Sequence, residues 1–190
     1  MAILKIARMG HPVLAGIAAP VADPTDPELK RLVADMIETM KDSDGAGLAA
    51  PQVHVPLRVV VFQVPGEPID ETLSAVERFD HTAPLTVLIN PVIQVMEEVL
   101  EGGWEGCLSV PGLRGWVERP RHIRYTGFDI AGNRVSRTAR GFHARVVQHE
   151  CDHLDGMLYP LRMQDLSKLL FESEVHHWLE QQETQNQAVK

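Results

Sequence analysis

Two histidines with a glutamate beside the first are the residues of this chain best suited to chemistry. His149, Glu150 and His153 form the pattern H-E-x-x-H within the stretch QHECDH. On a helix, residues four apart lie on the same face, so the two imidazoles can bind one metal ion. Glu150 is adjacent to a ligand without being one, and can act as a general base on a metal-bound water. Two histidines do not complete such a site, so a third protein ligand must come from elsewhere.

Three positions are candidates for that third ligand. One protease pattern continues with a glycine and a third histidine; Gly156 fits it, but the last position is Tyr159. A second pattern uses a glutamate on a following helix, where Glu172 stands. The third candidate is Cys107, because a thiolate and two imidazoles form a suitable tetrahedral set with an open fourth position. Cys151 is rotated away from the histidines on the helix and is not expected to bind.

The residues around the histidines predict the elements that position them. Residues 141–154 are typical of one helix that ends near Gly156, with Phe142 and Val146 placing the histidines beside an apolar face. An earlier helix begins after Asp26-Pro27-Glu28 and should end within residues 42–47. A last helix is expected over residues 164–182. Strands are predicted at 57–64, 86–89, 92–99, 123–129 and 134–139, and residues 65–84 form a polar surface segment.

This order of elements predicts an α+β fold rather than alternating βαβ units. We expect antiparallel or mixed sheets around a central metal-binding helix, with an N-terminal and a C-terminal helix. The length of 190 residues fits a single domain. Its core would be residues 1–163, followed by a C-terminal helix and tail over residues 164–190.

The composition narrows the classes of function. A net charge of −8 argues against a general nucleic-acid binder, although it leaves room for a small basic pocket. Two cysteines do not suggest a disulfide framework, which favours a reducing compartment. The chain has no signal-peptide pattern and no apolar run near the ~18 residues that span a membrane. These features predict a cytoplasmic protein without a membrane partner; a processed organellar protein would have the same composition.

A third stretch, GAGLAAPQ at residues 45–52, is a loop of small residues that carries one amide side chain, Gln52. In this order, GAGLAAPQ, EGCLS and QHECDH resemble the three motifs of the peptide deformylases. The resemblance implies a hydrolase that removes the N-formyl group from the formyl-methionine of newly made polypeptides. Nascent chains would be its partners, with ribosome association left open and no specific nucleic acid expected.

The resemblance also implies the metal site. Cys107, His149 and His153 would hold one divalent ion per chain, and the physiological ion of the family is usually Fe²⁺. Zn²⁺, Ni²⁺ or Co²⁺ can occupy such a site in purified protein, and the usual affinity order favours Zn²⁺ and Ni²⁺ over Fe²⁺.

Catalytic roles follow from the same resemblance. Glu150 would be the general base and acid, with a metal-bound water as nucleophile. Gln52 and the backbone N–H of Leu108 would stabilise the oxyanion, each contributing roughly 3 kcal/mol by analogy with other oxyanion holes.

The substrate would lie in a cleft of small and apolar residues. Gly47 is expected to pair its backbone with the bound peptide. Phe142, Val146 and Leu108, with Ala46 at the rim, are the candidates for a pocket that takes the methionine side chain. Gly103-Trp104 and Arg145 are unusual for the family and bear on the shape of this pocket.

Two acids are expected close to the ligands. Glu105 and Asp152 are candidates to orient the ligands or neighbouring arginines such as Arg114, with surface salt bridges as the alternative.

Two further hypotheses compete with the deformylase hypothesis. The first is an H-E-x-x-H metalloprotease with Glu172 as third ligand. The second is a non-catalytic, metal-stabilised binding domain, although structural sites are usually closed by four protein ligands and only three emerge here.

Overall fold

The computed structural model describes residues 2–65 and 75–188, which form an α+β fold with two antiparallel sheets. The larger sheet has the order β1 (Gly47–Ala49), β2 (Val59–Val64), β3 (Ala83–Val95), β6 (His122–Phe128) and β7 (Arg134–Arg140). The smaller sheet has the order β4 (Leu100–Cys107), β5 (Val110–Pro120) and β8 (Leu169–Phe171). The α-helices of the described chain are α1 (Pro27–Asp42), α2 (Ala75–His81), α3 (Gly141–Leu154) and α4 (Val175–Ala188).

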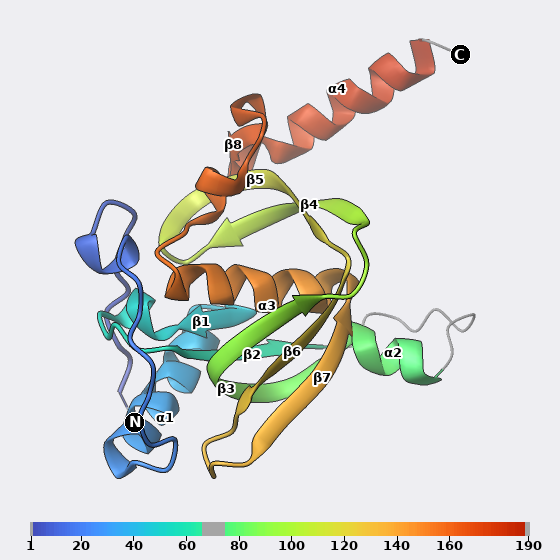
Figure 1. The fold of residues 1–190 in the computed structure, drawn as a ribbon. Helices are drawn as coiled ribbons and strands as arrows, with labels where there is room; N and C mark the ends of the chain where they lie inside the picture. Colours follow the sequence, from blue (N-terminus) through green and yellow to red (C-terminus); the bar gives the residue numbers. More distant parts are fainter. Residues whose placement is uncertain (1, 66–74, 189–190) are drawn as a thin grey trace.

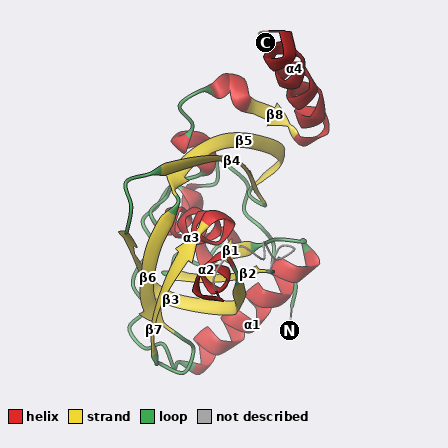
Figure 2. Ribbon diagram, turned by 90° about the vertical axis from the view of Figure 1, so that its right-hand side faces the viewer, coloured by secondary structure: helices red, strands yellow, loops and turns green. Residues whose placement is uncertain are grey.

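Helix α3 lies between the two sheets, as Figure 1 shows, and Figure 2 gives the view from the side. All its residues from 143 to 154 are buried. Ala144, Val147, Cys151 and Leu154 recur at helical spacing and belong to the core cluster that contains the larger sheet's inner face. The remaining sides of the helix are therefore free to carry polar residues toward the smaller sheet.

Strand β2 is buried on both faces and joins two parts of the core. Val60 and Phe62 belong to the cluster on the α3 side. Val59 and Val61 belong to the cluster that includes α1, where Met36 is fully buried. Alternate residues of a strand point to opposite faces, so this unbroken apolar run is what a covered strand requires.

The predicted ends of α1 and α3 are confirmed. The Asp26 side chain accepts the N–H of Glu28 at 2.8 Å, which caps α1 at its start. At the end of α3, Gly156 has φ +71°, and a Cβ there would meet the carbonyl of Ala15 at 2.7 Å. Glycine is needed at this position for both reasons.

The C-terminal segment differs from the prediction of one helix over residues 164–182. Leu169 lies on β8, opposite Gly115 of β5, and α4 begins only at Val175. The apolar residues at 166, 169 and 170 suggested helical spacing, but the short strand β8 joins the smaller sheet instead. The predicted C-terminal helix exists as α4, which extends away from the rest of the molecule beyond β8 (Figures 1 and 2).

Other differences lie in the middle of the chain. The predicted strands at 86–89 and 92–99 correspond to one strand, β3, with a bulge where Asn90 has φ 51°; β3 ends at Val95, so residues 96–99 lie outside it. Strands β4 and β5 were not predicted. The polar segment 65–84 contains α2 and the start of β3, while its residues 66–74 lie outside the described part of the chain. No helix among the described residues is long and apolar enough to cross a membrane.

Candidate metal centre and active site

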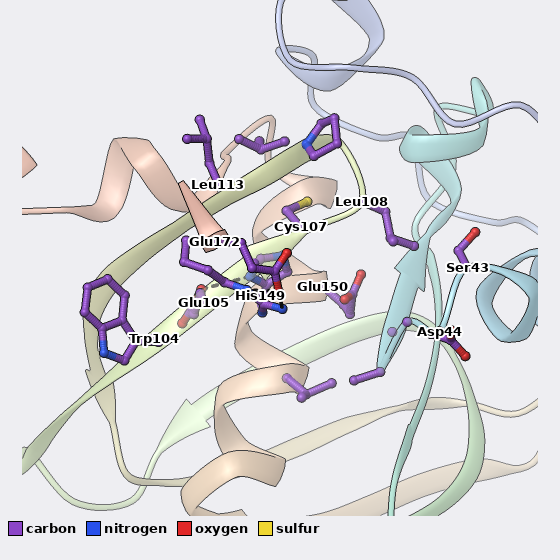
Figure 3. A pocket seen from close by; sticks show the side chains of 18 of the residues that line it. Ser43, Asp44, Trp104, Glu105, Cys107, Leu108, Leu113, His149, Glu150 and Glu172 are labelled. Carbon is purple, nitrogen blue, oxygen red and sulfur yellow. Dashed lines mark hydrogen bonds and ion pairs between the residues drawn. The ribbon is translucent and has the colours of Figure 1, made fainter. Parts of the chain in front are cut away.

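Cys107, His149 and His153 lie together although they come from different elements. Cys107 ends β4, and both histidines lie on α3. The ligand atoms of the three residues all lie within 4.8 Å of one another, and Cys107 Sγ is 3.4 Å from His153 Nε2. Among the described residues, these three form the candidate metal-binding group. Figure 3 shows the Cys107 side chain above that of His149, which comes from α3.

The spacing of these donors fits a metal ion. Ligand atoms about 2.0–2.3 Å from a shared centre lie about 3.3–3.8 Å apart in a tetrahedron. The contact between Cys107 and His153 is within this range, and the whole set requires only small adjustments to reach it. A thiolate with two imidazoles is also a donor set that suits a borderline-soft divalent ion.

Glu105 orients His149. The Nδ1–H of His149 donates to a Glu105 carboxylate oxygen at 2.8 Å, which turns Nε2 toward the metal site. Glu105 is 4% exposed and also accepts two hydrogen bonds from Arg119, at 2.6 and 2.9 Å. Burial alone would raise the pKa of Glu105, but Arg119 and His149 hold it well below its usual range. Burial alone would likewise lower the pKa of His149, yet hydrogen bonds to Cys107 and Glu105 raise it to about 10, so a metal ion that binds Nε2 must displace a proton from it.

Arg119 extends this network to Asp152 on α3. Its Nη1 donates to Asp152 at 2.8 Å, and Arg162 donates to the same carboxylate at 2.6 and 3.0 Å. The predicted partner Arg114 is not part of the network, because it pairs with Glu172 instead. Sequence reasoning missed Arg119. A buried glutamate demands a cation, but nothing in the sequence distinguishes Arg119 from Arg114.

Glu150 projects into the cleft from α3 (Figure 3). It is 5% exposed, and its Oε2 has no hydrogen-bond partner among the described residues. Burial raises the pKa of Glu150 to about 7. The backbone of β1 lies against it, since a Cβ on Gly47 would be 2.4 Å from Glu150 Oε1. A glycine is therefore needed for the carboxylate to occupy this position.

The Gln52 side chain is held by its amide oxygen. Gln52 Oε1 accepts the backbone N–H of Ala49 at 2.8 Å. This fixes its Nε2 at 3.2 Å from Ser109 Oγ and 3.5 Å from Cys107 Sγ. The amide donor thus faces the metal site. Leu108 lies in the two-residue turn that joins β4 to β5, next to Cys107. Ser109 is a second residue that the sequence did not single out.

A cleft of about 620 Å³ opens at this site. All the predicted substrate-binding residues line it: Ala46, Gly47, Leu108, Phe142 and Val146. Val146 is buried, whereas Phe142 is 48% exposed and so belongs to the wall of the cleft rather than to the core.

Arg145 and Gly103 shape one end of the cleft together. The Arg145 guanidinium donates to Glu105 at 2.8 Å, to the Val117 carbonyl at 2.8 Å and to the Glu101 carbonyl at 2.7 Å. A Cβ on Gly103 would lie 2.8 Å from Arg145 Cζ, so glycine leaves the space that the guanidinium fills.

The alternative ligands do not join the candidate group. Glu172 lies near the cleft but pairs with Arg114, with Arg114 Nε 3.0 Å from its carboxylate. Tyr159 stacks against the His149 ring, with the ring centroids 6.2 Å apart. Cys151 packs in the apolar core, where burial raises the pKa of its thiol. The geometry therefore does not favour a protease site built on Glu172.

Comparisons with known proteins agree with one another. The model of the polypeptide deformylase family matches residues 3–169. Peptide deformylase 1 of Bordetella pertussis is 54% identical over 171 residues, which cover 87% of this chain and 90% of the relative. Peptide deformylase 2 of Ralstonia nicotianae is 50% identical over 169 residues, covering 89% of this chain and 92% of the relative.

Solved structures give the same result. The crystal structure of peptide deformylase from Ehrlichia chaffeensis has a TM-score of 0.78 and 34% identity, covering 88% of this chain and 91% of that one. The Met-Ala-Ser-bound class I type b peptide deformylase of Acinetobacter baumannii has a TM-score of 0.75 and 35% identity, covering 85% of this chain and 99% of that one.

Proposed function

The chain belongs to the polypeptide deformylase family, and we propose that it acts on its substrate with the residues that line the cleft at Cys107. As a member of this family it removes the N-formyl group from newly made polypeptides that begin with formyl-methionine. One cluster of side chains supports the assignment of these residues to the reaction. Three donor atoms suited to a metal lie within 4.8 Å of one another, beside the buried carboxylate of Glu150, whose Oε2 has no hydrogen-bond partner among the described residues.

The family is metal-dependent, and the residues that would hold the ion are Cys107, His149 and His153. We propose Fe²⁺ as the physiological ion, with Zn²⁺, Ni²⁺ and Co²⁺ as ions that the same donors accept. When bound, a divalent ion here supplies a Lewis acid that makes water more acidic and polarises the formyl oxygen. Glu105 and Arg119 support this role by fixing the ring of His149.

Glu150 acts as the general base and then the general acid. Its carboxylate takes a proton from the attacking water and passes it to the amine that leaves as the C–N bond of the formamide breaks. Two features support this role. The carboxylate has an oxygen without a hydrogen-bond partner among the described residues, and Gly47 leaves the space in which it lies.

Gln52 and the backbone N–H of Leu108 stabilise the oxyanion that forms on the formyl oxygen. The Gln52 amide is oriented before substrate binds, since Ala49 holds its oxygen and Ser109 lies beside its nitrogen. A donor fixed in advance loses no energy to reorganisation, and each such donor contributes roughly 3 kcal/mol to transition-state stabilisation.

The methionine side chain would enter the pocket formed by Ala46, Leu108, Phe142 and Val146. Strand β1 is at the edge of the larger sheet, so the backbone of Gly47 can pair with an extended peptide. The crowded surroundings of Gly47 and Glu150 favour formyl, the smallest acyl group, over acetyl.

We also propose that the protein works in the cytoplasm, where nascent chains carry the formyl group, and that it can meet them at the ribosome.

The test is a product analysis of the purified, metal-loaded protein. With formyl-Met-Ala-Ser we expect formate and free Met-Ala-Ser, and with acetyl-Met-Ala-Ser almost no reaction. Cleavage of a peptide bond within the chain, without release of formate, would overturn the proposal in favour of a metalloprotease.

A further inference from the structure

A second cavity adjoins the catalytic cleft and has a different chemical character. This groove has a volume of about 780 Å³. Its lining includes four basic side chains, Lys5, Arg8, His11 and His54, and none of its lining residues is acidic. All four side chains are exposed. We call this feature the basic groove. Lys5 and Arg8 carry the positive charge of the groove at neutral pH, on a chain whose net charge is −8.

The position of the basic groove is fixed relative to the catalytic residues. The N-terminal segment that supplies Lys5 and Arg8 is bonded to both catalytic loops. The N–H of Ala7 donates to the carbonyl of Gln52 at 2.7 Å, and the N–H of Met9 donates to the carbonyl of Ser109 at 2.7 Å. His11 and His54 then meet edge to face, with ring centroids 4.7 Å apart.

The groove adjoins the catalytic cleft. Leu108 and Pro111 line both cavities, so the turn between β4 and β5 forms the boundary between them. A polypeptide held in the cleft by its first residue must continue outward, and each further residue adds about 3.3–3.6 Å of reach. A few residues beyond the formyl-methionine can therefore cross this turn.

Charge indicates what the groove binds. Neither Lys5 nor Arg8 has an acidic partner within residues 2–65 and 75–188. A negatively charged protein repels nucleic acid at long range. A carboxylate on a substrate already held in the cleft is instead present at high effective concentration, so modest local attraction is sufficient.

We propose that the basic groove binds acidic side chains of the substrate polypeptide downstream of the formyl-methionine, and so gives the enzyme a preference for acidic nascent chains. This inference rests on the deformylase function proposed above. The basic side chains of the groove lie outside the methionine pocket and contribute no group to the reaction, and the groove shares only Leu108 and Pro111 with the cleft.

The experiment compares kcat/KM for two peptides. Both begin formyl-Met-Ala-Ser and continue through a short Gly/Ser spacer, one into several glutamates and the other into the same number of glutamines. At low ionic strength we expect the wild-type protein to prefer the glutamate peptide about three- to tenfold, and added salt to reduce the preference. In the double variant Lys5→Gln/Arg8→Gln the ratio should fall close to one.

A matched control removes two charges elsewhere. Arg124 on β6 and Arg134 on β7 are exposed, and the double variant Arg124→Gln/Arg134→Gln changes the net charge equally. It should keep the wild-type preference. The proposal is overturned if the wild-type protein shows no preference, or if Lys5→Gln/Arg8→Gln keeps it. It is also overturned if that variant loses affinity for ribosomal RNA while its peptide preference stays unchanged. Failure to release formate even from formyl-Met-Ala-Ser would instead contradict the deformylase function.

Discussion

Glu105 is a buried carboxylate whose oxygens are shared by His149, Arg119 and Arg145. A buried charge is costly unless it is paired and hydrogen-bonded, and each of these three side chains donates a hydrogen bond to the carboxylate. One consequence is that His149 keeps a single ring orientation. Another is that Arg145, on the same helix, donates to the carboxylate that orients the proposed metal ligand His149, so the end wall of the cleft and the candidate metal site share one network.

The proposed role of Glu150 as general base leads to a direct prediction. In Glu150→Gln the side chain keeps its size but can no longer accept the proton of the attacking water, so kcat should fall roughly 10³-fold. Metal content should not change, because Glu150 is outside the ligand group. Formate release and metal analysis measure both quantities. Glu98→Gln, an exposed change of the same type, is the control. Loss of the metal in Glu150→Gln would show that Glu150 is a ligand.

Gly47 gives a second prediction. In Gly47→Ala the new Cβ would lie 2.4–2.6 Å from three atoms of the Glu150 side chain, so the carboxylate must move. The cleft leaves room for it, and the protein should still fold. A displacement of about 1 Å at a catalytic group costs roughly 100-fold in kcat/KM. Gly16→Ala is the matched control, because its Cβ would meet only Pro12 O, at 3.9 Å. Wild-type kcat/KM in Gly47→Ala would contradict the position assigned to Glu150.

Helix α3 was predictable from its sequence, whereas the strands that face it were not. The apolar spacing and Gly156 define the helix and its end. Strand β4 contains glycines at positions whose Cβ would strike Trp116, Arg145 or Arg114, and a Cβ on Gly115 of β5 would strike Met163 and Tyr159. These glycines are required by contacts between elements. Because glycine does not favour strands, the local sequence did not indicate a strand there. Strand β8 was mistaken for helix for a related reason, because its pairing with β5 depends on residues far away in the sequence.

The contact between α2 and α3 predicts a pH dependence of stability. His143 on α3 is fully buried; its Nδ1–H donates to the Asp80 carbonyl of α2 at 2.7 Å, and its Nε2 is 3.3 Å from the Tyr125 hydroxyl. Burial lowers the pKa of His143 to about 4, with the nearby Arg137 acting in the same direction. The imidazole is therefore neutral in the folded protein at neutral pH.

Below its ordinary pKa of 6.5, His143 binds a proton in the unfolded chain but not in the folded one. The stability that it contributes is present above about pH 6.5 and is lost as the pH falls toward about 4. We expect the free energy of unfolding to fall by roughly 1 kcal/mol per pH unit more in the wild type than in His143→Gln. Urea unfolding at several pH values measures the two slopes. The control His177→Gln, exposed on α4, should follow the wild type, and equal slopes in all three proteins would contradict this account.

Over the whole molecule, the site is assembled where the two sheets meet α3. Gln52 follows β1 of the larger sheet, Cys107 ends β4 of the smaller one, and the histidines lie between them (Figure 1). The residue types could be recognised from three short motifs. The choice of Cys107 over Glu172 could not be made from spacing, because it depends on β4 placing the sulfur 3.4 Å from His153 and on Arg114 pairing with Glu172.

Metal content after removal of each rival ligand tests this arrangement most directly. Cys107→Ala and Glu172→Ala are purified without oxygen beside the wild type, and the metal bound per chain is measured. We expect Glu172→Ala to keep the wild-type amount of metal and Cys107→Ala to lose most of it, because Cys107 alone supplies the thiolate. Retention of metal in Cys107→Ala together with its loss in Glu172→Ala would contradict the metal site described by this structure.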